Sequence, residues 1–233
     1  MKRFLKQLAV TGIFIMGAAS SAHAGAITFF NNDLAGYTAA LGGATVTLET
    51  FTATTHFPIS TGVLNSATNL PGIGITPGTI QPGVTYSTPV GSGNFFNIDC
   101  CRSVANSADR PFLDTVTSNG PVTATFDNAT NAFGFLGLGQ FMGSNLDITI
   151  HFLAGADYSN SIALNSQELF LGFISSASDI ASVVIGGGTT SFTFAIDDFQ
   201  FVTTPGTAVP EPGTLFLAGL GLAGIAALRR RRT

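Results

Sequence analysis

Three carboxylates are the side chains of this sequence best suited to bind a metal ion. Asp197 and Asp198 are adjacent on a β-rich segment near residue 200, and Glu49 lies on an earlier β-rich segment. Adjacent carboxylates repel each other unless a cation or hydrogen-bond donors lie beside them, and calcium prefers several oxygen ligands. The three residues therefore form a candidate calcium site. The alternative is that one carboxylate faces solvent and the other accepts a turn-like hydrogen bond.

The two cysteines, Cys100 and Cys101, are adjacent. Two neighbouring thiols are too few for a metal site, and a thioredoxin-like centre would show Cys-x-x-Cys. In an oxidising compartment the pair can form a vicinal disulfide or can bond to cysteines of another molecule. We favour the vicinal disulfide, in a structural role.

His56 and His151 are the candidates for a general base. The sequence contains no Gly-x-Ser-x-Gly and no His-Glu-x-x-His, so nothing pairs either histidine with a nucleophile or a zinc ion. An acid pair for glycoside hydrolysis can come from distant strands and leaves no motif. We therefore expect a protein that is not an enzyme, with a secreted hydrolase as an alternative.

A sugar-binding surface usually offers exposed aromatic rings. The chain has no Trp and only three Tyr, and its 21 Phe mostly alternate along predicted strands, which indicates a core. Tyr86, in a Pro- and Gly-rich segment, is the best candidate for such a ring. It supports the alternative function of a glycan binder.

The folded part is predicted to be one all-β domain over residues 25–202. A short helix at 34–41 begins after the capping residues Asn31, Asn32 and Asp33 and ends at Gly42 and Gly43. Apolar residues alternate in several later segments separated by Gly, Asn and Ser, which predicts antiparallel strands of a β-sandwich. The predicted strands are 45–51, 122–126, 146–152, 169–174, 180–185 and 191–202.

Two further features refine this prediction. Phe192, Phe194 and Ile196 share one parity in the last strand, whereas Phe199 and Phe201 have the other. A β-bulge near Asp197 and Asp198 would place all five on one face. Residues 71–93 hold four prolines and are predicted to be an irregular loop or sheet edge.

Charge excludes one class of partner. Between residues 25 and 209 the sequence has two arginines and twelve acidic residues, a net charge of −10. Nucleic-acid binding needs a basic surface that displaces phosphate counterions. We therefore expect no nucleic-acid partner.

The N-terminal end predicts export. Lys2, Arg3 and Lys6 precede an apolar stretch, and Ala22-His23-Ala24 is a small-x-small cleavage site. This order is typical of a secretory signal peptide over residues 1–24, removed by signal peptidase to leave Gly25 first. The alternative is an N-terminal membrane anchor, for which the apolar stretch is short.

The C-terminal end has three elements in order. Pro210, Glu211 and Pro212 are followed by sixteen uncharged residues at 213–228. The last element is a cluster of basic residues, Arg229, Arg230, Arg231 and Arg232. Sixteen residues in a helix extend about 24 Å, and the arginines would stay cytoplasmic. A linker at 203–208 precedes this segment, and a plain membrane anchor is the alternative interpretation.

These three elements resemble the PEP-CTERM sorting signal, here over residues 209–233. The resemblance implies recognition by the membrane enzyme exosortase, transient anchoring in the inner membrane, removal of the tail, and delivery to the cell surface or extracellular matrix. It also implies a Gram-negative bacterium that makes exopolysaccharide.

The domain itself is similar to the ectodomains of many PEP-CTERM proteins. The matching features are the helix at 34–41, Leu48-Glu49-Thr50-Phe51 and Ile196-Asp197-Asp198-Phe199. The similarity implies a jelly-roll-like sandwich shared with carbohydrate-binding modules, whose first and last strands often hold a structural calcium. It departs from the family pattern because Glu49 precedes the phenylalanine. The function that this resemblance implies is a structural or adhesive component of a polysaccharide matrix or biofilm.

Overall fold

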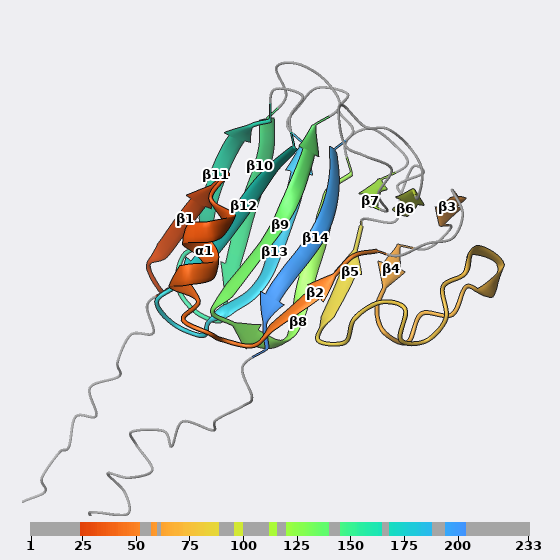
Figure 1. The fold of residues 1–233 in the computed structure, drawn as a ribbon, viewed down its shortest axis with the longest axis horizontal. Helices are drawn as coiled ribbons and strands as arrows, with labels where there is room; N and C mark the ends of the chain where they lie inside the picture. The colour runs from red at the N-terminus through yellow and green to blue at the C-terminus, as the bar shows by residue number, and fades with distance from the viewer. Residues whose placement is uncertain are drawn as a thin grey trace, which may run out of the picture.

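The computed structural model describes residues 24–51, 57–59, 62–88, 96–99, 112–115, 120–139, 145–164, 168–187 and 194–203. They form two antiparallel sheets that pack face to face, with one short α-helix on the outside (Figure 1). The predicted antiparallel β-sandwich with a short N-terminal helix is confirmed.

Sheet A has eight strands, in the spatial order β1 (Ile27–Asn31), β12 (Glu168–Ser175), β9 (Ala132–Gly139), β14 (Phe194–Val202), β7 (Phe112–Thr115), β6 (Phe96–Asp99) and β3 (Phe57–Ile59), with β2 (Val46–Glu49) also paired to β14. Sheet B has six strands, in the order β11 (Tyr158–Ala163), β10 (Asn145–Phe152), β13 (Ile180–Gly187), β8 (Val122–Thr130), β5 (Val84–Ser87) and β4 (Val63–Leu64). The first and last described strands, β1 and β14, thus belong to the same sheet.

The core lies between the sheets and is rich in phenylalanine. On the inner face of sheet A, Phe29 is opposite Phe173 and Phe173 is opposite Phe133. The stacked rings of these two pairs have centroids 4.9 and 5.0 Å apart. Sheet B contributes aliphatic side chains at alternate positions, such as Leu146, Ile148 and Ile150 of β10. The predicted inward face of this strand is therefore confirmed, because period-two alternation places every second side chain in the core.

The predicted bulge in β14 is present. The register with β9 shifts between Asp197 and Gln200, and Asp198 has a φ of 46°. On its other edge, β14 pairs with β7 before the bulge and with β2 after it. The shift keeps Ile196 and Phe199 both in the core despite their different parity.

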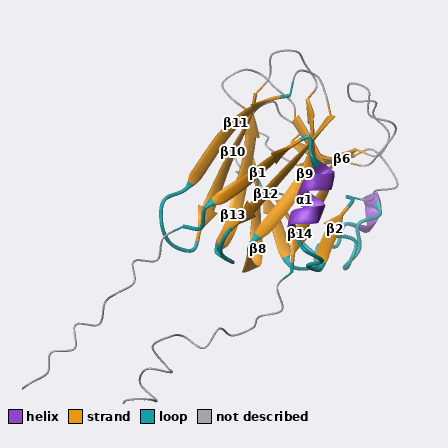
Figure 2. Ribbon diagram, turned by 60° about the vertical axis from the view of Figure 1, so that its left-hand side comes forward, coloured by secondary structure: helices purple, strands orange, loops and turns teal. Residues whose placement is uncertain are grey.

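Helix α1 (Leu34–Ala40) packs on the outer face of sheet A (Figure 2). The Asp33 carboxylate accepts a hydrogen bond from the Gly36 amide at 2.8 Å and caps the helix, as predicted. Tyr37 is buried against Phe30 and Phe170 in a second, smaller apolar cluster. After the helix, Gly42 and Gly43 have φ values of 61° and 84°, where L side chains are strained.

The prediction of an irregular segment over residues 71–93 is wrong in part. It begins with a 3₁₀ helix at Pro71–Ile73, but β5 within it pairs with both β4 and β8. Ile75 and Ile80 are also buried in the main core. Four prolines suggested a loose loop, yet the residues between them form one strand and supply core side chains.

Candidate functional site

The residues of the sorting signal lie outside the described residues, as do the two cysteines and His56. The described residues include no helix that is long and apolar enough to cross a membrane. The side chains that the structure does place belong to two groups. One surrounds the bulge of β14, and the other covers the outer face of sheet B.

Glu49 ends β2 and is opposite Phe199 of β14, just past the bulge. Its side chain is only 1% exposed. One carboxylate oxygen, Oε1, accepts the Phe51 amide at 2.8 Å, and Oε2 accepts the Gln81 amide at 2.6 Å. Phe51 has a φ of 45°, so the chain turns sharply around the carboxylate. The residue thus joins β2 to the segment that precedes β5.

Burial of the Glu49 carboxyl group favours its protonated form. Desolvation raises the pKa of Glu49 above its ordinary value, while backbone hydrogen bonds from Gln81, Phe51 and Thr50 act in the opposite direction. The nearby Tyr86 is fully buried, and desolvation followed by the charge of Glu49 raises its pKa well above the usual range. The raised pKa keeps the phenol neutral, and its hydroxyl has no hydrogen-bond partner among the described residues.

Asp197 and Asp198 lie on the bulge itself. Asp197 is buried, and its Oδ1 accepts the backbone amide of Asp198 at 2.7 Å. This is the turn-like hydrogen bond of the alternative to calcium. Across the described ranges, no group of three or more His, Cys, Asp or Glu side chains is arranged to hold a metal ion. Calcium bound by Glu49, Asp197 and Asp198 stays a prediction.

The prediction of Tyr86 as an exposed ring for sugar binding is wrong. Tyr86 lies on β5 with its ring at 0% exposure, edge-on to Phe51 and Phe199. The alternation that turns Val84 and Tyr86 toward the core was a strand signal that the surrounding prolines and glycines obscured. The residue serves the core and cannot meet a ligand at the surface.

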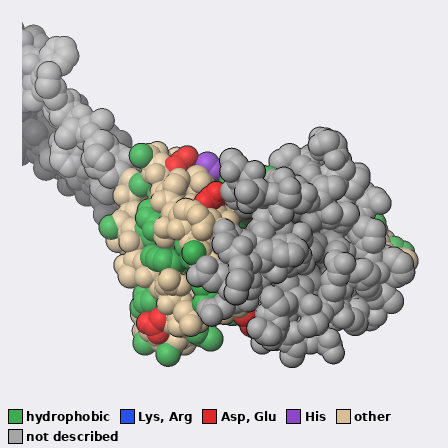
Figure 3. Space-filling model, turned by 90° about the horizontal axis from the view of Figure 1, so that it is seen from above, with side chains coloured by type: hydrophobic (Ala, Val, Ile, Leu, Met, Phe, Trp, Pro, Cys, Tyr) green, Lys and Arg blue, Asp and Glu red, His purple; other side chains and the backbone are tan. Residues whose placement is uncertain are grey.

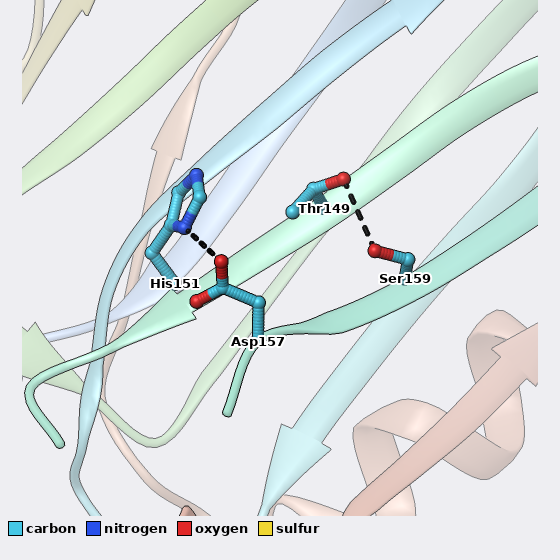
Figure 4. Close-up of polar contacts among 4 residues, drawn as sticks. All are labelled: Thr149, His151, Asp157 and Ser159. Atoms are coloured by element: carbon cyan, nitrogen blue, oxygen red, sulfur yellow. Dashed lines mark hydrogen bonds and ion pairs between the residues drawn. The ribbon is translucent and has the colours of Figure 1, made fainter. Parts of the chain in front are cut away.

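His151 lies on the outer face of β10, as its position in the strand predicted. Its Nδ1 is 2.9 Å from Oδ2 of Asp157, with both side chains about half exposed (40% and 49%). Beside them the hydroxyls of Thr149 and Ser159 are 3.3 Å apart (Figure 4). Ser159 therefore bonds to a threonine and not to the histidine, so these four residues do not form a nucleophile–base–acid chain.

The outer face of sheet B carries hydroxyl side chains in rows across the strands. One row follows the register Ser159, Thr149, Val184, Thr123 and Ser87, and the next follows His151, Ser182, Thr125 and Thr85. Neighbouring strands are about 4.8 Å apart, so the hydroxyls recur at that interval. We call the seven Ser and Thr residues of these rows the hydroxyl face. All seven are half-buried or exposed.

The Asp, Glu, Lys and Arg residues within the described ranges carry charge of one sign only. Of the thirteen acidic residues only Asp109 and Glu211 fall outside the described ranges, which leaves eleven, whereas every Lys and Arg falls outside them. Figure 3 shows acidic and histidine side chains among uncharged ones on one face of this part. With Arg102 and Arg110 included, residues 25–209 still carry a net charge of −10, which repels polyanions.

Sequence reasoning missed Asp157 and the hydroxyl face. The available signal was a hydroxyl residue at every second position, as Thr-x-Ser in β5, Thr-x-Thr in β8 and Ser-x-Ser in β11, which places these hydroxyls on the face opposite the core. Cross-strand register, which aligns these pairs into rows, depends on long-range pairing that no local pattern specifies.

Three solved structures are similar to the described fold. A mutant of the family 29 carbohydrate-binding module CBM29-2 has 8% identity and a TM-score of 0.33, over 68% of this chain and 91% of that chain. The CBM22-1–GH10 modules of a Clostridium thermocellum endo-1,4-β-D-xylanase, complexed with xylohexaose, have 8% identity and a TM-score of 0.35, over 53% and 27%. TmCBM61 in complex with β-1,4-galactotriose has 11% identity and a TM-score of 0.30, over 52% and 88%. These likenesses concern strand arrangement alone.

No curated protein matches the chain. A family model does match: residues 208–232 fit the PEP-CTERM protein-sorting motif, within one residue of the segment predicted. This match includes the Pro-Glu-Pro element and all four arginines. The chain therefore carries, after its β-sandwich, the PEP-CTERM protein-sorting motif that implies processing by an exosortase.

Proposed function

We propose that this protein is an exported, non-catalytic component of the cell surface or extracellular matrix of a Gram-negative bacterium, with a structural or adhesive role beside exopolysaccharide. The observation that carries the proposal is the sorting motif at residues 208–232, which addresses the β-sandwich to the outside of the cell. The Ser159 hydroxyl bonds to Thr149 and not to His151, so within the described residues the His151–Asp157 pair has no nucleophile bonded to it, which supports a non-catalytic role.

The test is the fate of the protein in its native host. Intact mass is measured separately for the membrane, matrix and released fractions. A matrix-bound form that lacks residues 1–24 and the segment beyond Pro212 supports the proposal. A protein that keeps residues 213–233 and stays in the membrane fraction contradicts it, because the tail would then be an ordinary anchor.

A second candidate function is binding of a neutral glycan, and the hydroxyl face is the observation that favours it. Rows of hydroxyls at the strand spacing offer repeated donors and acceptors to a polyol. The acidic surroundings disfavour an anionic polymer. Binding of this kind depends little on salt, which separates it from binding through charge.

The glycan proposal is tested with the processed protein and neutral polysaccharides in a pull-down or calorimetric assay. Combined Thr149→Val and Ser159→Ala replacements should weaken binding about tenfold or more. The control is Thr28→Val on β1, an exposed threonine of the other sheet. Equal binding by both variants, or no saturable binding by the native protein, would rule out this face.

A further inference from the structure

Residue 25, the expected first residue of the exported protein, is held by a carboxylate. The Gly25 nitrogen donates a hydrogen bond to Oδ2 of Asp179 at 2.6 Å. Asp179 lies in the connection between β12 and β13, far away in sequence. Its other oxygen, Oδ1, accepts the Ser175 hydroxyl at 2.7 Å, so the carboxylate is oriented toward residue 25.

The next residue along the chain is held as well. The Ala26 amide donates to the Ser176 hydroxyl, and the Ala26 carbonyl accepts the Ser176 amide, both at 3.0 Å. These bonds continue the antiparallel pairing of β1 with β12 beyond the strand itself. Because β1 is an edge strand with one partner, its start depends on this short set of contacts.

The place that residue 25 occupies leaves no room for a side chain unless a neighbouring group shifts. A Cβ there would collide with the Ser175 hydroxyl and lie 3.0 Å from the Ala177 nitrogen. The Ser175 hydroxyl is the group that orients Asp179, so it cannot move away without losing that bond. This close packing therefore favours glycine as the residue whose nitrogen contacts the Asp179 carboxylate.

Charge makes the contact unusual for this domain. Every Lys and Arg lies outside the described residues, so within them Asp179 has no basic side chain beside it. A positive charge on the Gly25 nitrogen would place a cation on a carboxylate that is otherwise held by a hydroxyl. Signal-peptide cleavage after Ala24 would create that charge.

We propose that Asp179 is the counter-ion of the mature N-terminus, so that removal of the leader converts a neutral hydrogen bond into an ion pair that anchors β1. Hydrolysis of the Ala24–Gly25 bond by signal peptidase adds the hydroxyl of water to the Ala24 carbonyl carbon and its proton to the Gly25 nitrogen. The new amine takes up one more proton from solvent to become an ammonium group. Charge-assisted hydrogen bonds are stronger than neutral ones, and an ammonium group has three donors.

The sequence makes a direct experiment possible. There is no lysine after Lys6, so the α-amino group is the only primary amine of a chain that begins at Gly25. The full precursor is expressed in an exporting host, and the processed protein is purified. Intact mass first identifies its N-terminal residue. The rate of acetylation by a trace of acetic anhydride is then measured against pH, because only the unprotonated amine reacts.

We expect Gly25 as first residue and an amine pKa about one unit above the usual value of about 7.7–8.0, because a nearby carboxylate favours the charged form. Asp179→Asn should return the pKa to the usual value. Asp147→Asn, which removes an exposed carboxylate from sheet B, should leave the raised value unchanged. A different first residue or an ordinary pKa in the native sequence overturns the proposal, and neither measurement requires a variant to fold.

A second readout separates the ion pair from the neutral bond. Acetylation of the processed protein removes the charge but keeps one N–H. It should lower the melting temperature of the native protein at pH 7 and change that of Asp179→Asn much less. Equal losses in the two proteins would overturn the proposal, because the charge would then act through some other group.

Discussion

Glu49→Ala would remove the acceptor of one buried and one part-buried backbone amide at once. The Phe51 and Gln81 amides lie 2.8 and 2.6 Å from the carboxylate oxygens, and the side chain is 1% exposed. A buried donor left without a partner costs about 1–3 kcal/mol, and a part-buried donor costs no more than that, so the two together cost at most about 6 kcal/mol. Part of this cost is offset, because the substitution also removes a carboxylate whose burial is itself unfavourable. We expect a net loss of about 2–4 kcal/mol in the free energy of unfolding.

The assay is urea unfolding of the processed protein, followed by fluorescence or circular dichroism. Glu49→Gln is the companion variant: it keeps one carbonyl acceptor and places an amide donor toward the other N–H, so it should cost about 1–2 kcal/mol. Asp147→Asn is the control for loss of one exposed charge and should stay within about 0.5 kcal/mol.

The same residue predicts a pH dependence with an unusual sign. Burial raises the pKa of Glu49 above its ordinary value of 4.5, so the folded protein binds this proton more tightly than the unfolded chain. Its contribution to stability is fully present below about pH 4.5 and is lost as pH rises through the folded pKa. The stability of native protein relative to Glu49→Gln should therefore decrease upward from pH 4.5.

Two results would refute this reasoning. A loss below about 1 kcal/mol in Glu49→Ala would mean that water or a shifted chain satisfies both amides. A stability difference between the native protein and Glu49→Gln that rises with pH above 4.5 would mean that hydrogen bonds outweigh desolvation. Amide exchange at Gln81 gives a local check, because its protection should fall in Glu49→Ala and persist in the control.

Three further predictions concern the core, the helix and calcium. Gly172→Ala should cost about 1–3 kcal/mol in thermal unfolding, because a Cβ would lie 2.6 Å from the Tyr37 ring, whereas Gly72→Ala, with open space around it, should be nearly neutral. Phe199→Ala should lower the free energy of unfolding, measured in urea, by about 3–5 kcal/mol, because this fully buried ring contacts Phe126, Phe133 and Phe135. A loss under about 2 kcal/mol would contradict its central place in the core. If the predicted calcium binds, EDTA should lower the melting temperature and Asp198→Ala should abolish that response; an unchanged melting temperature with added calcium would exclude the ion.

The elements that sequence predicted best are those whose signals are local. Alternation located β10, because each apolar side chain reports its own face. The shift in parity between Ile196 and Phe199 located the bulge, since one extra residue is the simplest way to keep both side chains in the core. Asp33 and Gly42 marked the ends of α1 through capping and a positive φ.

Other elements were missed because their signals are weak or depend on distant partners. β9 is Ala-Phe-Gly-Phe-Leu-Gly-Leu-Gly, and its glycines read as turns, although Gly134 and Gly172 leave room for the Phe170 ring. β11 has few apolar residues because it is an edge strand. Tyr86 was misplaced for a related reason: flanking prolines dominated the pattern, while pairing with β8 decided its burial.

The same distinction between local signals and long-range pairing applies to the candidate surfaces. Composition alone indicated an acidic domain, since a count of charged residues needs no strand register. The hydroxyl face needs the register of β11, β10, β13, β8 and β5, and the contact of Gly25 with Asp179 joins residues 154 positions apart. Both depend on how distant strands pair, and the pattern of residues along a single sequence does not specify that pairing.

The distribution of charge connects the two terminal signals with the surface they leave behind. Seven of the nine basic side chains lie within residues 1–24 and 229–232, so removal of both ends leaves Arg102 and Arg110 against twelve acidic residues up to position 209. A chain with basic ends can associate with anionic lipid headgroups during export, whereas the processed domain is repelled by them. If both ends are removed as we propose, the same processing would lower the affinity of the domain for the membrane, and it would leave uncharged hydroxyls as the groups through which sheet B could meet a neutral partner.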